Sequence, residues 1–102
     1  MKSNSVVVPM DTPLENENLV LVVDDEASIR RSLSEILGDE GIDVIEAEDG
    51  ESAIAAVQKN NPPVVLLDIW MPGLDGLETL QRIKEIAPST QVIMISGHAT
   101  IS

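Results

Sequence analysis

The sequence has 102 residues, enough for one small domain, and 43% of them are hydrophobic. This content supports a folded core and excludes an intrinsically disordered chain, but the core must be aliphatic because Trp70 is the sole aromatic residue. A net charge of −12 argues against direct binding to nucleic acid or to an anionic membrane surface. Cysteine is absent and no apolar run is long enough to cross a membrane, so we expect a cytoplasmic protein without disulfide or thiol chemistry.

The first 18 residues are expected to form a flexible N-terminal tail. They are polar, and Pro9 and Pro13 interrupt any regular element. The apolar run Val6–Val8 is the exception, and it leaves a second interpretation open: a short strand that adds to an exposed sheet edge.

Four short runs rich in apolar residues are predicted to be β-strands. They are Leu19–Val23, Asp43–Ala47, Val64–Leu67 and Gln91–Ile95. Helical patterns alternate with them, and successive β-α-β units build a parallel sheet with right-handed crossovers. We therefore predict an α/β fold, a flavodoxin-like doubly wound parallel sheet with the strand order 2-1-3-4-5.

Three predicted helices connect these strands. The first begins near Glu26, with Asp25 as its predicted N-cap and Gly41 at its end. The second begins at the turn Asp49-Gly50, and the third stops before Pro88. The apolar residues that mark the helices are Ile29, Leu33, Ile36 and Leu37 in the first, Ala53, Ile54 and Val57 in the second, and Leu77, Leu80, Ile83 and Ile86 in the third.

Two of the predicted strands end in acidic residues. The run at 19–23 leads into Asp24 and Asp25, and the run at 64–67 leads into Asp68. In the order 2-1-3 these strands are neighbours, so their carboxyl ends should bring the three carboxylates to one edge of the sheet. A hard divalent cation such as Mg2+ suits this cluster, because it relieves a repulsion that otherwise raises the carboxyl pKa values.

Each of these residues taken alone has a plainer explanation. Asp25 can serve only as a helix cap and Asp24 only as a solvated loop acid, whereas an acid at the end of an apolar strand, such as Asp68, needs a partner that compensates its desolvation. Asp68 is expected to face solvent and is the best candidate for a nucleophile toward a phosphoryl group. Ser96, at the end of the next strand, could donate to a phosphoryl oxygen. His98 is expected to be a loop residue rather than a metal ligand.

Three longer motifs extend this pattern. They are VLVVDDE at 20–26, LLDIWMPGLDG at 66–76 and VIMISGHA at 92–99, together with Asp49-Gly50 at the start of the second predicted helix. In combination they resemble the receiver domain of two-component response regulators, over the whole segment from Leu19 to Ser102. The SGHA continuation is similar to receivers attached to sigma-54-type transcriptional activators.

The resemblance implies roles for individual residues. Asp68 would be the phosphoacceptor, and Ser96 the switch hydroxyl that turns toward the phosphoryl group. Asp25 would bind Mg2+ directly, Asp24 would bind it through water, and the backbone carbonyl of Trp70 would be a further protein ligand. The chain would then be a phosphorylation-dependent signalling switch that accepts a phosphoryl group from a partner histidine kinase and relays it to an output domain, expected to be transcriptional. It would assist its own phosphorylation and dephosphorylation as a regulatory domain, and would not be a metabolic enzyme.

One departure from the family pattern concerns the C-terminal part. Receivers carry a lysine and an aromatic switch residue on a fifth strand, whereas the last lysine here is Lys84, on the third predicted helix, and Phe and Tyr are absent. We therefore expect residues 19–102 to be a receiver truncated after the fourth strand, without the fourth helix, fifth strand and fifth helix. Arg30 and Arg31 are expected to point to solvent, which would make them poor substitutes for the lysine.

Two other functions stay open, and so does self-association. A degenerate receiver could act as a dimerisation module without phosphorylation, which the missing lysine favours and the acid triad disfavours. An aspartyl-phosphate phosphatase similar to haloacid dehalogenases would need a second acid two residues after the nucleophile, where this chain has Trp70. The fourth predicted strand, Gln91–Ile95, would form an apolar sheet edge through which the chain could self-associate.

Overall fold

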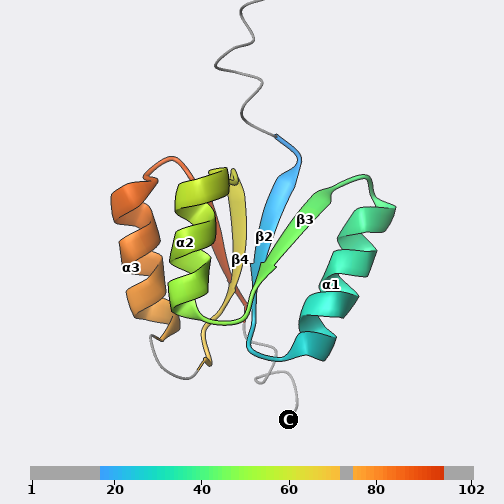
Figure 1. Cartoon of the computed structure of the whole chain (residues 1–102), viewed down its shortest axis with the longest axis horizontal. Helices are drawn as coiled ribbons and strands as arrows, with labels where there is room; N and C mark the ends of the chain where they lie inside the picture. Colours follow the sequence, from blue (N-terminus) through green and yellow to red (C-terminus); the bar gives the residue numbers. More distant parts are fainter. Residues whose placement is uncertain (1–16, 72–74, 96–102) are drawn as a thin grey trace, which may run out of the picture.

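The computed structural model describes residues 17–71 and 75–95, in which strands and helices alternate as the sequence predicts. The strands are β2 (Leu19–Val23), β3 (Asp43–Ala47), β4 (Val64–Asp68) and β5 (Gln91–Ile95). The helices are α1 (Ala27–Asp39), α2 (Gly50–Asn60) and α3 (Gly76–Ile86) (Figure 1). β4 is longer than predicted because it includes Asp68, so this acid belongs to the strand and not to the loop that follows.

The strands form one parallel sheet in the order β3-β2-β4-β5. This order reproduces the first four positions of the predicted arrangement, and the prediction of an α/β doubly wound sheet is confirmed. At the carboxyl end of β2, Val23 pairs with Ala47 of β3 on one side and with Leu67 of β4 on the other. One further step along the register of β2 and β4 leads to Asp24 and Asp68, which explains why these two acids come together.

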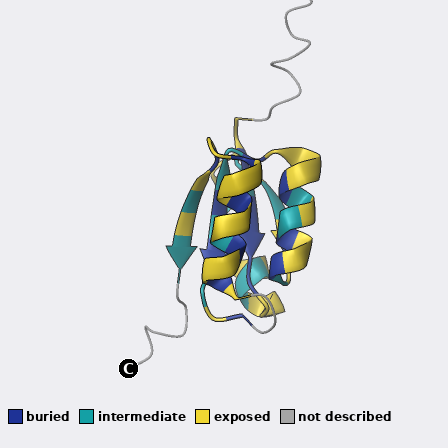
Figure 2. Ribbon diagram, turned by 90° about the vertical axis from the view of Figure 1, so that its left-hand side faces the viewer, coloured by how far each residue is buried: buried dark blue, intermediate teal, exposed yellow. Residues whose placement is uncertain are grey.

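Helices lie on both faces of the sheet (Figure 1). α2 and α3 lie side by side on one face, and α1 lies on the other face, against β2 and β3. The main core fills the space between the sheet and the pair α2 and α3, and its buried members are Leu21, Val23, Ala47, Ala53, Val57, Val65, Leu67, Met71, Ile83 and Ala87. Figure 2 shows the buried strands at the centre and the exposed outer surfaces of the helices. Alternate residues of each strand reach this core, as the period-two direction of strand side chains requires.

The apolar residues predicted for α1 are only partly covered by the described parts of the chain. Ile36 is 60% exposed, and Ile29, Leu33 and Leu37 are half-buried. On the same side of the sheet, Ile93 of β5 is 51% exposed, because α1 packs on β2 and β3 and does not extend over β5. The described parts of the chain therefore leave part of this sheet face uncovered.

The apolar pattern predicted for α3 is correct in the middle of the helix and wrong at its ends. Leu77 and Ile86 are 64% and 42% exposed, whereas Ile83 is fully buried. Thr79, which the pattern does not include, is also fully buried. Its hydroxyl donates to the carbonyl oxygen of Asp75 at 2.8 Å, so burial leaves no unsatisfied polar group on this side chain.

The end of α1 confirms the role predicted for Gly41. The amide of Gly41 donates to the carbonyl oxygen of Gly38 at 3.0 Å. The amide of Ile42 donates to the carbonyl oxygen of Leu37, also at 3.0 Å. These two bonds form a Schellman motif, which requires a left-handed residue after the helix, and Gly41 has φ of +83°.

Several predictions concern residues outside the described parts of the chain. They are the tail as far as residue 16 with its run Val6–Val8, the part of the motif at 66–76 that contains Pro72 and Gly73, and the residues Ser96 and His98. These stay predictions. Within residues 17–71 and 75–95, no helix has the length and hydropathy that crossing a bilayer requires.

Candidate metal centre at the carboxyl edge of the sheet

Three carboxylates gather at the carboxyl ends of β2 and β4. One oxygen each from Asp24, Asp25 and Asp68 lie within 4.8 Å of one another. Asp24 is 1% exposed and Asp68 is 0% exposed, whereas Asp25 is exposed. The plainer explanation of Asp24 as a solvated loop acid is therefore wrong, and so is the expectation that the Asp68 side chain faces solvent. The cluster combines two buried acids with one exposed acid at its entrance.

The turn between β2 and α1 holds Asp24 in place. Its amide donates to the carbonyl oxygen of Ala47 at 3.1 Å, which extends the pairing of β2 with β3. Its Oδ1 accepts the amide of Glu26 at 2.9 Å. The N-cap of α1 is Glu26, without a side-chain cap bond, so the prediction of Asp25 as the N-cap is wrong. The side chain of Asp24 makes the hydrogen bond that closes the turn. The carboxylate of Asp25 does not cap the helix and takes part in the cluster.

The backbone after β4 constrains Asp68. Its Oδ1 accepts the amide of Trp70 at 3.0 Å, and the amide of Ile69 donates to the carbonyl oxygen of Ile95 at 3.1 Å. The first residue of α3, Gly76, packs directly on this segment. A Cβ at Gly76 would lie 2.6 Å from the Cα of Ile69 and 3.0 Å from the carbonyl oxygen of Asp68. A residue without a side chain is therefore needed at this position for α3 to approach the acid.

Burial is the main electrostatic influence on Asp24. It raises the pKa of this carboxyl above the ordinary value, because desolvation disfavours the charged form. The amide of Glu26 opposes the rise in pKa, and repulsion from Asp68, Asp25 and Glu26 adds to it. An all-oxygen set of mutually repelling carboxylates, two of them buried, has the chemistry that a hard divalent cation neutralises.

Comparison with known proteins gives the family. Residues 20–102 match the family described as the response regulator receiver domain. The chain belongs to this family. The resemblance inferred from the sequence motifs is confirmed, and the chain is a regulatory phosphoacceptor domain of the kind that acts as a phosphorylation-dependent signalling switch. Receiver domains generally bind Mg2+ at an acidic pocket, and the cluster of Asp24, Asp25 and Asp68 has the donors that fit this ion.

Three similar proteins illustrate the relationship. NtrX of Azorhizobium caulinodans, a nitrogen assimilation regulatory protein, is 44% identical over 84 residues, which cover 80% of this chain and 18% of that protein. ResD of Bacillus subtilis, a transcriptional regulatory protein, is 46% identical over 82 residues, which cover 80% of this chain and 34% of that protein. The crystal structure of NtrX from Brucella abortus matches with a TM-score of 0.75 and 48% identity, over 81% of this chain and 19% of that chain. The receiver thus spans at most 34% of these proteins.

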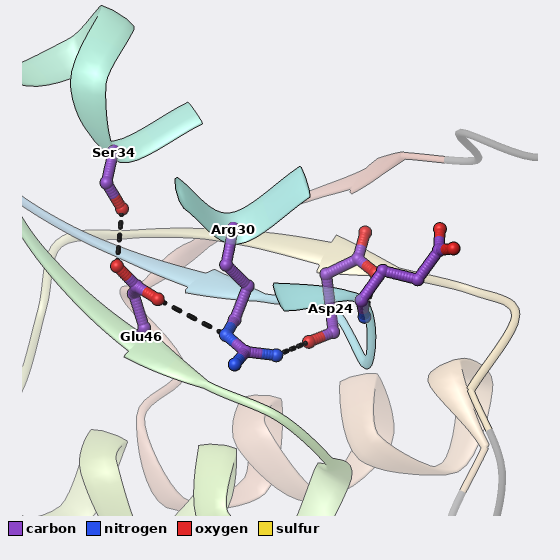
Figure 3. A network of polar contacts seen from close by, with 5 residues as sticks. Asp24, Arg30, Ser34 and Glu46 are labelled. Atoms are coloured by element: carbon purple, nitrogen blue, oxygen red, sulfur yellow. Dashed lines mark hydrogen bonds and ion pairs between the residues drawn. The ribbon is translucent and has the colours of Figure 1, made fainter. Parts of the chain in front are cut away.

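The receiver also contains a polar network that the sequence prediction missed. Arg30 was expected to point to solvent, but its side chain is only 16% exposed and lies between α1 and β3 (Figure 3). Its Nη1 donates to the backbone carbonyl oxygen of Asp24 at 2.7 Å, and its Nε donates to Glu46 Oε1 at 3.2 Å. Arg31 is exposed, as predicted. A signal was available in Glu46, because strand alternation places this acid on the sheet face that α1 covers, where a carboxylate needs a basic partner.

Trp70, predicted to supply a ligand, and Lys84, the last lysine of the chain, both lie in the described part of the receiver. Trp70 is 59% exposed beside the cluster. Lys84 donates from Nζ to the carbonyl oxygens of Pro88 at 2.9 Å and Thr90 at 2.7 Å, just before β5 begins. Asp68 pairs with Ile95 at the other end of β5. Lys84 therefore stabilises the loop between α3 and β5, at the opposite end of the strand from the acids.

Proposed function

We propose that Asp68 is the residue on which this receiver accepts its phosphoryl group, from a partner histidine kinase. The observation that supports this assignment most strongly is the meeting of Asp24, Asp25 and Asp68 within 4.8 Å at the carboxyl edge of the sheet. In open α/β sheets, this edge at the switch in strand order is where ligands bind. Asp68 is the last residue of β4, and the amide of Trp70 orients its Oδ1.

The transfer is a nucleophilic displacement. A carboxylate oxygen of Asp68 forms a bond to phosphorus while the bond from phosphorus to the histidine nitrogen of the kinase breaks, and that nitrogen keeps the electron pair. The product is an acyl phosphate on Asp68. The fixed orientation of Oδ1 by Trp70 limits the rotation of the carboxylate and presents it in one direction.

We further propose that Asp25 and Asp68 hold Mg2+ directly, with Asp24 acting through water and the backbone carbonyl of Trp70 as another ligand. When bound, Mg2+ supplies positive charge that neutralises the carboxylates and the phosphoryl oxygens. Because Asp25 is exposed, an ion that it binds can exchange with solvent. Because Asp24 is buried, it suits an acid that acts on the ion through water and not by direct contact.

Ser96 is proposed as the switch hydroxyl that responds to phosphorylation. It directly follows Ile95 in the sequence, and Ile95 pairs with Asp68 at the edge of the sheet where the acids meet. A hydroxyl at that edge could donate to a phosphoryl oxygen and thereby bias a two-state arrangement of the segment that follows.

The partners of this receiver are proposals as well. Because the chain is 44% identical to NtrX and 46% identical to ResD, whose names describe regulators, we propose a transcriptional output domain, of the sigma-54-type activators as the SGHA motif suggests. The receiver would consist of residues 19–102 after a tail, act in the cytoplasm where histidine kinases obtain ATP, and self-associate through the β5 edge. The net charge of −12 favours basic protein partners over nucleic acid.

The test of this function is phosphorylation of the full-length protein with acetyl phosphate and Mg2+. Intact mass should rise by one phosphoryl group, and hydroxylamine should remove it because acyl phosphates are cleaved by this nucleophile. Asp68→Asn should abolish the gain, whereas Asp39→Asn, which changes an exposed acid on α1, should label like wild type. Equal labelling of Asp68→Asn would disprove the assignment. A wild-type protein that never labels but dimerises would favour the alternative of a degenerate dimerisation module.

A further inference from the structure

Arg30 ties the backbone between two of the clustered acids to the neighbouring strand. Its guanidinium donates from Nη1 to the carbonyl oxygen of Asp24 at 2.7 Å. This oxygen belongs to the peptide bond that joins Asp24 to Asp25. Because a peptide unit is planar, holding its oxygen also sets the direction in which the chain continues to the Cα of Asp25. The contact therefore acts on the exposed acid of the cluster without touching its carboxylate.

The contact from Arg30 adds to the other hydrogen bonds that hold the turn around Asp25. Asp24 is fixed by its amide, bonded to Ala47, and by its Oδ1, which accepts the amide of Glu26. The second of these bonds also spans Asp25, because it joins the residues on either side of it. The bond from Arg30 adds a direct restraint on the oxygen of the peptide leading to Asp25, where the chain turns from β2 into α1.

Arg30 is in turn held by Glu46 of β3, which also binds Ser34 of α1. Its Nε donates to Glu46 Oε1 at 3.2 Å, and Ser34 Oγ donates to Glu46 Oε2 at 2.8 Å (Figure 3). The guanidinium thus uses two sides of its rigid fork at once, one for the strand and one for the acid turn. The Arg30 side chain is 16% exposed and the Glu46 side chain is 41% exposed, so the bond to Asp24 is partly buried whereas the ion pair with Glu46 is open to solvent on the side of the acid.

We propose that Arg30 is a positioning residue for the metal-binding acids: it orients the Asp24–Asp25 peptide so that both carboxylates face Asp68. This inference rests on the proposed Mg2+ site. It assigns to Glu46 and Ser34 the task of orienting Arg30, and it makes the contact between α1 and β3 part of the metal centre.

Electrostatics and positioning predict opposite effects of removing Arg30, which gives a sharp test. A positive charge near a cation site repels the cation, so its loss alone should strengthen Mg2+ binding. Loss of positioning should weaken Mg2+ binding instead, by about tenfold, as is typical for residues that orient metal ligands. The readout is a Mg2+ titration followed by the fluorescence of Trp70, the sole aromatic residue, whose amide is bonded to Asp68.

The matched control is the neighbouring arginine. Arg31→Gln removes the same charge from the same helix at an exposed position, so it should leave the Mg2+ dissociation constant within about twofold of wild type. Arg30→Gln should raise that constant about tenfold. Arg30→Lys keeps the charge but not the fork, and it should fall between wild type and Arg30→Gln, whereas a purely electrostatic role predicts no change for this variant.

A second readout needs no metal. In EDTA, the amide of Glu26, which is bonded to Asp24 Oδ1 at 2.9 Å, should exchange its hydrogen faster in Arg30→Gln and in Glu46→Gln than in Arg31→Gln. Tighter or unchanged Mg2+ binding by Arg30→Gln, Arg30→Lys and Glu46→Gln would overturn the positioning role alone. Absence of any Mg2+ response in the wild-type chain would overturn the proposed metal site and this inference with it.

Discussion

Asp24, which directly follows β2, and Asp68, the last residue of β4, lie one register step beyond the pair formed by Val23 and Leu67, and both are buried. A parallel register with two acids at the same level brings their charges together by backbone pairing alone. The folded chain therefore carries a repulsion that no solvent screens well, and a divalent cation is the simplest way to relieve it.

The first prediction is that Mg2+ stabilises the folded chain. At a Mg2+ concentration ten times the dissociation constant, the free energy of unfolding should rise by about 1.4 kcal/mol. Thermal melts in EDTA and in saturating Mg2+ measure this difference. Asp25→Ala should abolish the shift, and Asp39→Ala, at an exposed site on α1, should keep it. A wild-type melt that does not move would count against the site.

The second prediction is that Asp24→Asn stabilises the chain in EDTA at neutral pH. Burial raises the pKa of Asp24, so its charged form is less favourable in the folded than in the unfolded chain. Asparagine removes this charge and keeps an oxygen that can accept the amide of Glu26. A relief of about 1 kcal/mol would raise the melting temperature by about 4–8 °C in a domain of this size.

The stability gain expected for Asp24→Asn depends on pH. The penalty of charged Asp24 is absent below its unfolded-state pKa of 3.8 and grows as the pH rises through the higher folded-state value. The advantage of Asp24→Asn should therefore disappear at acidic pH. It should also disappear in saturating Mg2+, where wild type gains stability that the variant has partly lost. A variant that is less stable than wild type in EDTA at pH 7 would contradict this account.

The third prediction compares two glycines. Gly76→Ala places a Cβ 2.6 Å from the Cα of Ile69, so the backbone must shift, and we expect a loss of about 1–3 kcal/mol in the free energy of unfolding. Gly38→Ala places its Cβ in open space on α1 and should instead stabilise the chain by about 0.5–1 kcal/mol. Urea unfolding of both variants measures the two signs. Equal effects would show that the close approach of α3 to the segment after Asp68 is unimportant.

The fourth prediction concerns the start of α2. The hydrogen bond from the Ser52 hydroxyl, followed by that from its amide, lowers the pKa of Asp49. A depressed pKa means that the stability contributed by the charged Asp49 is present above the unfolded value of 3.8 and is lost as the pH falls through the folded value. Asp49→Ala should cost about 1 kcal/mol at neutral pH, the usual cost of losing an N-cap.

The control for this prediction is Asp49→Asn, which can accept the same bonds but does not titrate. Melting curves from neutral to acidic pH should show Asp49→Ala approaching wild type as the pH drops below the ordinary value of 3.8. The stability of Asp49→Asn relative to Asp49→Ala should stay nearly constant over the same range. A gap between wild type and Asp49→Ala that persists at low pH would contradict the titration of this cap.

Much of the receiver could be predicted from its amino acids because the relevant signals are local. Apolar runs of strand length, interrupted by turn residues such as Asp49-Gly50 and Gly41, predicted every strand and helix that the structure describes. The acids at the carboxyl ends of two runs predicted the cluster of Asp24, Asp25 and Asp68, since strand ends are visible in the pattern and the flavodoxin-like order places the first and third predicted strands side by side.

Other features depend on packing between distant segments, which local patterns do not contain. The burial of Asp68, the close approach of Gly76 to the backbone after it and the exposure of Leu77 all depend on how α3 packs on the sheet. Arg30 turns inward because β3 places Glu46 beside α1, 16 residues further along the chain. Hydrophobic periodicity identifies the apolar face of a helix. It does not give the direction of a long charged side chain, because that direction depends on which oppositely charged group lies near enough to pair with it. That group comes close only when the strands have assembled into the sheet.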